Sequence, residues 1–175
     1  MQQAITLTQP APGKSCGGCT LCCKVLKITA LSKPHGTWCA HCQPGVGCRV
    51  YDDRPEECRT FLCGWLVNSQ LGPEWKPDKS RLIITNAADG SGLAIRCDPG
   101  YPNAWRKEPY HSQILQWAKA AKPQDGPIVV AVGNRLTVIG PEGEFPLGEF
   151  NDGDQIFRKF SGDRLVGVRV VRASE

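Results

Sequence analysis

Nine of the ten cysteines in this 175-residue chain lie between Cys16 and Cys63. The segment opens with Cys16-Gly-Gly-Cys19-Thr-Leu-Cys22-Cys23, which places four thiols within eight residues. Thiolates three residues apart can reach one metal ion because the turn between them folds back, and Gly17 and Gly18 carry no Cβ that would obstruct that turn. The same spacing recurs in Cys39-Ala-His-Cys42. We therefore expect a small metal-thiolate lobe.

A disulfide-stapled secreted domain is the main alternative for so dense a set of cysteines. The residues before Ala11 contain neither the basic nor the apolar segment of a secretory signal, so we expect a reducing, cytoplasmic location. Nine is also an odd number to pair, and adjacent Cys22 and Cys23 cannot be joined without strain. The cysteines are thus expected to be free thiols that serve as ligands.

The length suits one domain of the α+β class. We predict an N-terminal tail over 1–15, a cysteine-rich lobe over 16–72 and a body over 73–175. In this interpretation the lobe packs as one unit on a mostly antiparallel sheet with one main helix. No run of 18 apolar residues is present, which predicts that no segment spans a membrane.

The formal net charge of +4 leaves the thiolates out, although a divalent ion held by four thiolates carries −2. Through Cys63 the chain has seven lysines and arginines against four acids, and the remainder has fourteen against thirteen. We interpret the basic residues near Cys48 and Cys58 as charge compensation, with Arg54 and Arg59 placed just outside the ligands. No basic stripe interleaved with aromatic residues is present, so nucleic-acid binding is not expected.

A helix is predicted around the last two cysteines of the lobe. Asp53 can cap it, Pro55 suits its first turn and Glu56 completes a capping box. On that helix Cys58, Phe61, Leu62 and Trp65 share one face, and Cys63 points well away from Cys58. Both cysteines could then bind one ion only if the helix ends near Cys63.

The order of these cysteines resembles that of a known family. The matching motifs are Cys16-x2-Cys19-x2-Cys22-Cys23, then Cys39, then Cys48-Arg-Val-Tyr51-x2-Arg54-Pro55-x2-Cys58-Arg59-x-Phe61-x-Cys63. They are similar to those of the YkgJ-like CxxCxxCC cysteine-cluster proteins, a zinc- or iron-chelating domain. The resemblance covers residues 16–65 and implies a bacterial, cytosolic chelating module. A flagellin lysine methylase carries a similar cluster in a much longer chain. Cys42 is additional here, and the spacer before Cys39 is short.

The predicted metal ligands are cysteines of the lobe, with Cys42 as a possible further member: Cys16, Cys19, Cys22, Cys23, Cys39, Cys48, Cys58 and Cys63. An iron–sulfur cluster of the 4Fe-4S type and zinc are both open, because sulfur ligands serve both. The C-x2-C-x2-C triple followed by a remote cysteine favours the cluster. His35 and His41 could bind zinc, although loop histidines are more often solvated. Cys22 and Cys23 point in different directions, so one of them could serve a second site or pack as a small apolar residue.

The body is predicted from alternation and turn residues. Strands are expected near 82–86 and 93–97, joined by 88–92, and again at 128–132 and 135–139 around Gly133-Asn134. Cys97 alternates with Leu93 and Ile95, which indicates a core residue rather than a ligand. A helix begins near Pro109 with an apolar stripe through Ile114 and Trp117, and 165–171 supplies a closing strand.

No catalytic or nucleotide-binding motif is present, so an enzyme is not the favoured interpretation. Three function classes are open. The first is a structural zinc module that supports a protein-interaction surface, and the second is an iron–sulfur protein that transfers electrons or senses oxidants. The third is a metal-dependent enzyme or protein-modification accessory, which needs an open coordination position. The expected partner is an unidentified protein, and no small-molecule substrate is indicated.

Overall fold

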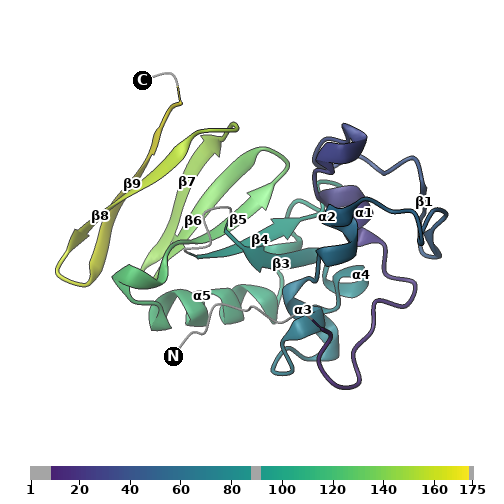
Figure 1. The fold of residues 1–175 in the computed structure, drawn as a ribbon. Helices are drawn as coiled ribbons and strands as arrows, with labels where there is room; N and C mark the ends of the chain where they lie inside the picture. Colours follow the sequence, from purple (N-terminus) through teal and green to yellow (C-terminus); the bar gives the residue numbers. More distant parts are fainter. Residues whose placement is uncertain (1–8, 88–91, 174–175) are drawn as a thin grey trace.

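A five-stranded sheet forms the centre of the body in the computed structural model, which describes residues 9–87 and 92–173 (Figure 1). Its strands lie in the order in which they occur in the chain: β3 (Leu82–Asn86), β4 (Leu93–Cys97), β5 (Ile128–Val132), β6 (Arg135–Gly140) and β7 (Gly143–Glu149). A separate ribbon follows, made of β8 (Gln155–Ser161) and β9 (Arg164–Val171). The fold class is α+β, with mostly antiparallel pairing, as predicted.

The one parallel pair in the sheet is β4 with β5, and it has a clear cause. The chain leaves β4, forms a 3₁₀ turn at Ala104–Arg106 and the helix α5 (Tyr110–Ala120), and passes through a second 3₁₀ turn at Pro123–Asp125 before β5. A helical crossover of this kind returns the chain to the same end of the sheet, so the next strand runs parallel to the last. The remaining neighbours are antiparallel.

The two faces of the sheet are covered by different parts of the chain. One face, with Ile84, Ile95 and Val130, packs against Ile114 of α5 and forms the largest core cluster. On the opposite face, Ala94, Val129 and Val138 lie under Leu165 and the ribbon. Side chains alternate along each strand, so consecutive residues such as Ala94 and Ile95 pack into two separate cores.

The cysteine lobe consists of short elements connected by turns. They are α1 (Leu21–Val25), a 3₁₀ turn at Thr29–Leu31, β1 (Cys42–Gln43), β2 (Gly47–Cys48), α2 (Glu56–Thr60), α3 (Gly64–Val67), a 3₁₀ turn at Pro73–Trp75 and α4 (Pro77–Ser80). The lobe meets both faces of the sheet at its β3 edge: Leu21 and Val25 of α1 pack on Ile83, and Trp65 and Leu66 of α3 join the helix-side core. The apolar core is therefore continuous from lobe to body.

Most predictions for the body are confirmed. The strands at 82–86, 93–97, 128–132 and 135–139 form as expected, and the turn residues 88–91 lie outside the described part of the chain. Cys97 is 1% exposed and lies in the core with Ile95. Pro109 occupies the N-cap of α5 rather than its first turn. The predicted closing strand is β9, but it pairs with β8 and does not extend the main sheet.

The helix predicted around Cys58 and Cys63 is wrong in its extent. It begins after Pro55 with no side-chain cap from Asp53 and ends at Thr60, because Phe61 is extended. A new short helix begins after Cys63. Cys58, Phe61, Leu62 and Trp65 therefore do not share a helical face: Phe61 packs with α1, whereas Leu62 and Trp65 join the helix-side core. Among the described residues, no helix has the length and apolar character that crossing a bilayer requires.

Candidate metal centre

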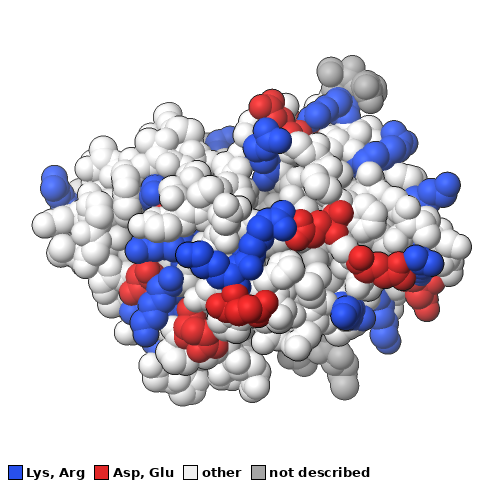
Figure 2. Space-filling model, turned by 180° about the vertical axis from the view of Figure 1, so that it is seen from behind, with Lys and Arg blue, Asp and Glu red and all other residues white. Residues whose placement is uncertain are grey.

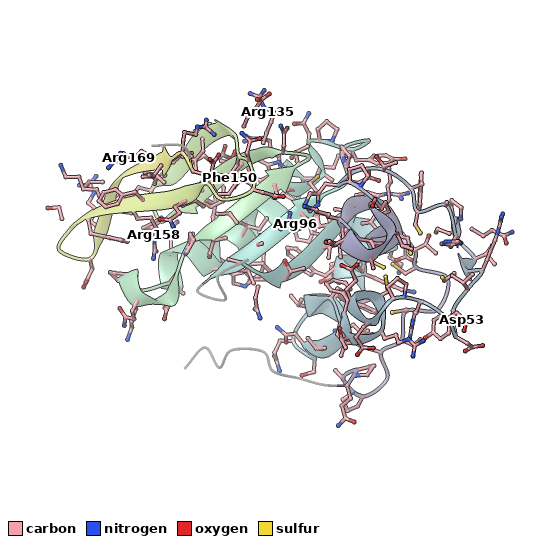
Figure 3. All side chains as sticks on the ribbon, turned by 45° about the horizontal axis from the view of Figure 1, so that its top comes forward. Asp53, Arg96, Arg135, Phe150, Arg158 and Arg169 are labelled. Atoms are coloured by element: carbon pink, nitrogen blue, oxygen red, sulfur yellow. The ribbon has the colours of Figure 1, made fainter. Side chains whose placement is uncertain are left out.

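All ten cysteines lie in described segments, and all are free thiols. The sulfur atoms of the lobe gather beside α1, at the end of the molecule away from the ribbon (Figure 3). Cys39 and Cys42 are buried, Cys16 is exposed, and the other lobe cysteines are half-buried. The lobe thus concentrates reduced thiols on short elements that the body holds from one side.

The first cysteine turn is held in place by Lys14. The Cys19 amide donates to the Cys16 carbonyl at 3.0 Å, which closes the turn. Just before it, the Lys14 ammonium donates to the carbonyls of Trp65, Asn68 and Leu71 at 3.0, 2.6 and 2.6 Å. These carbonyls follow Cys63, so Lys14 ties the turn at Cys16 to the segment that carries Cys63.

Cys16, Cys19 and Cys63 form what we call the first thiol group. Burial, together with the nearby thiols of Cys16 and Cys19, raises the pKa of Cys63 to about 11. Dehydration also raises the pKa of Cys16, and the cations Lys76 and Arg54 oppose that change. Each thiol therefore lies within electrostatic range of the others, although Cys63 is more than forty positions away in sequence.

The second thiol group is built on the backbone of α1. It comprises Cys22, Cys23, Cys39, Cys42, Cys48 and Cys58. The Cys39 amide donates to the Cys23 carbonyl at 2.9 Å, and the Cys42 amide donates to the Cys39 carbonyl at 3.0 Å. Cys42 is the register partner of Cys48 in the pairing of β1 with β2. One long-range backbone hydrogen bond, one tight turn and one short hairpin thus bring four cysteines from three segments together.

The thiols of the second group influence one another. A hydrogen bond with Cys22, followed by burial, raises the pKa of Cys23 far above its usual value, and Cys23 is also hydrogen-bonded to Cys42. Burial and Cys23 raise the pKa of Cys42 to about 11. Burial raises the pKa of Cys58, and Cys23, Cys39 and Cys48 add to the change. Without metal, Cys23, Cys42 and Cys58 are therefore neutral thiols near neutral pH.

Gly18 allows the two thiol groups to approach each other. A Cβ at Gly18 would lie 2.6 Å from the carbonyl oxygen of Gly45, which is closer than real Cβ atoms come. The Gly45 amide in turn donates to the Thr20 hydroxyl at 3.0 Å. The turn of the first group thereby lies directly against the loop between Cys42 and Cys48, so glycine is required here for packing.

Lys33 supplies a buried cation beside the second thiol group. It is 6% exposed, and its ammonium donates to the carbonyls of Lys24, Pro34 and Thr37 at 3.1, 2.9 and 2.8 Å. Burial lowers its pKa, whereas the thiols of Cys39, Cys23, Cys22 and Cys58 raise it. A fixed cation beside these thiols favours the thiolate forms that metals require.

The two arginines predicted to surround the ligands have different positions. Arg54 stacks on the Tyr51 ring at 3.8 Å and lies within electrostatic range of Cys16, and its Nε is buried without a hydrogen-bond partner in the described chain. Arg59 donates from Nε to the Arg54 carbonyl and from Nη2 to the Asp52 carbonyl at 2.8 and 2.7 Å. Arg54 therefore acts on a thiol, and Arg59 holds the loop before Cys58.

The histidines of the lobe are not grouped with the thiols. Nδ1 of His35 lies 3.1 Å from the Lys27 amide nitrogen, at the junction with the body. The carbonyl of His41 accepts the Arg49 amide at 2.8 Å, which extends the β1–β2 hairpin. Sulfur therefore dominates the candidate donor set.

Cysteine sulfurs are suitable metal ligands, but their side chains do not surround a single metal position in this structure. In residues 9–87 and 92–173, no three Cys, His, Asp or Glu side chains are placed so that they could hold an ion. The thiols of the second group touch in a chain from Cys22 through Cys23 to Cys42, not around one point. Metal binding would therefore require the cysteine side chains and their loops to move inward.

Comparisons with protein-family models, with curated proteins and with solved structures found no match.

Three cations beside the thiols were missed by the sequence analysis. Lys14, Lys33 and Lys76 contact or influence the thiol groups, yet Lys76 lies beyond the predicted lobe. Lys14 and Lys33 form no local pattern, because their partners are backbone carbonyls that only the fold brings together. The presence of a basic excess through Cys63 was the one available signal.

Proposed function

We propose that this chain is a metal-binding protein whose lobe holds an iron–sulfur cluster or zinc through cysteine thiolates. One observation carries the proposal: nine free thiols from separate segments gather in one lobe, next to cations fixed by their own hydrogen bonds. Cytosolic cysteines that pack only as small apolar residues have no need of such cations.

The division into two thiol groups supports two binding sites in this proposal. Cys16, Cys19 and Cys63 would supply the first site. Cys22, which touches Cys23 of the second thiol group, also packs on the apolar cluster of Cys19 and Cys63 and would complete that first site. Cys23, Cys39, Cys42, Cys48 and Cys58 would supply the second. Adjacent Cys22 and Cys23 would then serve different metals, as their divergent directions favour.

The cations would offset the charge that metal loading creates. Each ligand must lose its proton, so the lobe gains negative charge as it binds metal. Lys76 and Arg54 act on the first group, and Lys33 acts on the second. When bound, zinc would supply a rigid structural link, and an iron–sulfur cluster would supply a one-electron redox centre.

The test is to purify the full chain anaerobically, without a metal-binding tag, and to measure metal, acid-labile sulfide and the visible spectrum together. Cys63→Ser and Cys39→Ser should each lose part of the metal, because they lie in different thiol groups. Cys97→Ala is the matched control, since Cys97 is buried in the sheet core. Iron with sulfide would identify a cluster, and zinc alone a structural site. Wild-type protein without bound metal after anaerobic reconstitution with either metal would contradict the proposal.

A structural zinc module with an interaction surface is the second candidate, and exposed apolar side chains favour it. Trp38, Val46 and Tyr51 are 40%, 65% and 59% exposed, and all three lie on lobe loops between cysteines. Exposed apolar side chains of this kind can contribute to a protein-interaction surface. In this case Trp38→Ser would leave the zinc content unchanged and would abolish capture of the partner.

A further inference from the structure

A small cleft lies where the cysteine lobe meets the sheet. It is lined by Val25, His35 and Gly36 from the lobe, and by Arg96, Ala131 and Gly133 among the residues of the body. The cleft is shallow: its enclosed space is about 10 Å³, and about 200 Å³ when the open mouth is counted. The cleft is separate from the thiol groups, and nothing in the proposed function uses it.

Its position follows from the way the sheet face is covered. Arg96 pairs with Ile83 on β3 and Ala131 on β5, so all three point to the face opposite α5. On that face α1 covers Ile83, and the ribbon covers the cluster that contains Ala94. Arg96 therefore lies between the two covers (Figure 3).

Arg96 is a half-buried cation without a protein partner. Among residues 9–87 and 92–173, no hydrogen bond or ion pair to its guanidinium is found, and burial lowers its pKa. Asp98, two positions after Arg96 in the chain, is paired with Lys24 at 2.6 Å, and Asp152 is paired with Lys27 at 2.7 Å. A half-buried guanidinium that no acceptor of the described chain contacts keeps its hydrogen-bonding capacity for solvent or for a ligand.

His35 offers a second donor to the same cleft. Its Nδ1 lies 3.1 Å from the Lys27 amide nitrogen and 3.3 Å from the Val25 carbonyl oxygen. Because the amide can only donate, we let Nδ1 accept that closer hydrogen bond and assign the ring hydrogen to Nε2. Burial and the charge of Arg96 lower the pKa of His35, which keeps the ring neutral. Basic and acidic side chains are interspersed on the surface seen in Figure 2, and the Asp152 carboxylate, which lies within electrostatic range of His35, is bound by Lys27.

We propose that this cleft binds a small oxyanion, a carboxylate or a phosphate, between the guanidinium of Arg96 and the imidazole of His35. The planar guanidinium matches two oxygens of such a group with two parallel hydrogen bonds. The ligand would connect the lobe to the sheet, because His35 belongs to the first and Arg96 to the second. The bound anion would lie next to α1, which carries Cys22 and Cys23.

The experiment is a calorimetric titration of the full protein with acetate and with inorganic phosphate, at neutral pH and constant ionic strength adjusted with chloride. We expect saturable binding of at least one of them, and the better ligand identifies the class. Arg96→Gln should weaken binding about tenfold or more, because a charge-assisted bond is lost. Arg135→Gln is the control, since Arg135 is an exposed arginine at the start of β6 in the same sheet.

Absence of saturable binding for both anions would overturn the proposal, and so would unchanged affinity in Arg96→Gln. If Arg96→Gln does not fold, the wild-type protein still decides the question. The ring resonances of His35 should shift with anion concentration and reach a plateau in magnetic resonance spectra. A linear drift, or no shift, would count against the site. Metal content is measured separately, so a failure here leaves the metal proposal untouched.

Discussion

The sheet and the cysteine lobe are stabilised in different ways. In the sheet, Ile83 and Ile95 are 0% exposed. Ile83 packs among apolar residues of α1 on one face, and Ile95 packs in the α5 core on the other. In the lobe, the helices have four or five residues, and the ammonium groups of Lys14 and Lys33 donate to backbone carbonyls of these helices and of the adjoining loops. A region with so little apolar core depends on polar links, and in our proposal on metal.

The largest effect should come from the sheet core. Ile95→Ala removes a fully buried side chain, so we expect the free energy of unfolding to fall by about 3 to 4 kcal/mol. The fall should be the same in metal-loaded and metal-free protein, measured by urea denaturation. Val166→Ala is the control, because Val166 is 45% exposed on the ribbon and should change stability little. A loss that appears only without metal would break the distinction between the two regions.

Lys33→Met should have the next largest effect. It leaves three carbonyls without their donor, so we expect a loss of about 2 to 3 kcal/mol in the metal-free protein. It also removes the cation beside the second thiol group, so metal affinity should fall as well. Lys79→Met, at an exposed position on α4, is the matched control. Equal behaviour of the two variants would show that the ammonium does not hold the lobe.

Gly18→Ala tests the close approach of the two thiol groups. The added methyl group would meet the Gly45 carbonyl at 2.6 Å, so we expect about 1 to 2 kcal/mol of destabilisation and weaker metal binding. At Gly167 in β9 a Cβ would have its nearest contact at 3.9 Å, so Gly167→Ala should be tolerated. Normal metal content and stability in Gly18→Ala would mean that the loops can separate without cost.

The smallest effect expected is a pH dependence of the metal-free protein. Folding raises the pKa of Cys42 and Cys63 from 9.0 to about 11, so the folded state binds more protons than the unfolded state in that range. Stability should be fully present below pH 9 and should fall as the pH rises toward 11. The lowered pKa values of Lys14 and Lys33 act in the opposite sense, but the affected thiols outnumber them. The check is to measure the midpoint of urea denaturation as a function of pH under reducing conditions. In Cys63→Ser the midpoint should depend less steeply on pH. A midpoint that rises over this range would contradict the assignment.

The sequence predicted the body better than the lobe for a physical reason. Alternation over Leu93, Ile95 and Cys97 reports directly on a buried strand face, and the α5 stripe reports on its packing. In the lobe, propensity predicted a continuous helix through Cys58, but the extended Phe61 packs with α1 and the helix stops. Tertiary packing decides such short elements, and the carbonyl partners of Lys14 and Lys33 are likewise visible only in the fold.

The last three strands show another limit of prediction from sequence. The sequence analysis identified β9 but not β7 or β8, because Gly143–Glu149 contains two glycines and a proline, and Gln155–Ser161 carries basic residues on an outer strand. The candidate ligands were all visible as cysteines. Their division between two groups was not, because it depends on Lys14 bringing Cys63 to Cys16 and on the pairing of Cys42 with Cys48.

The most direct test of the account is amide hydrogen exchange of the full chain with and without its metal, read by mass spectrometry over all segments. The account predicts that metal slows exchange strongly in residues 16–63 and leaves β4, β5 and α5 nearly unchanged, because the sheet has its own core. Equal protection of the lobe in both states would contradict the claim that metal completes the lobe, and so would a loss of protection in the sheet on metal removal.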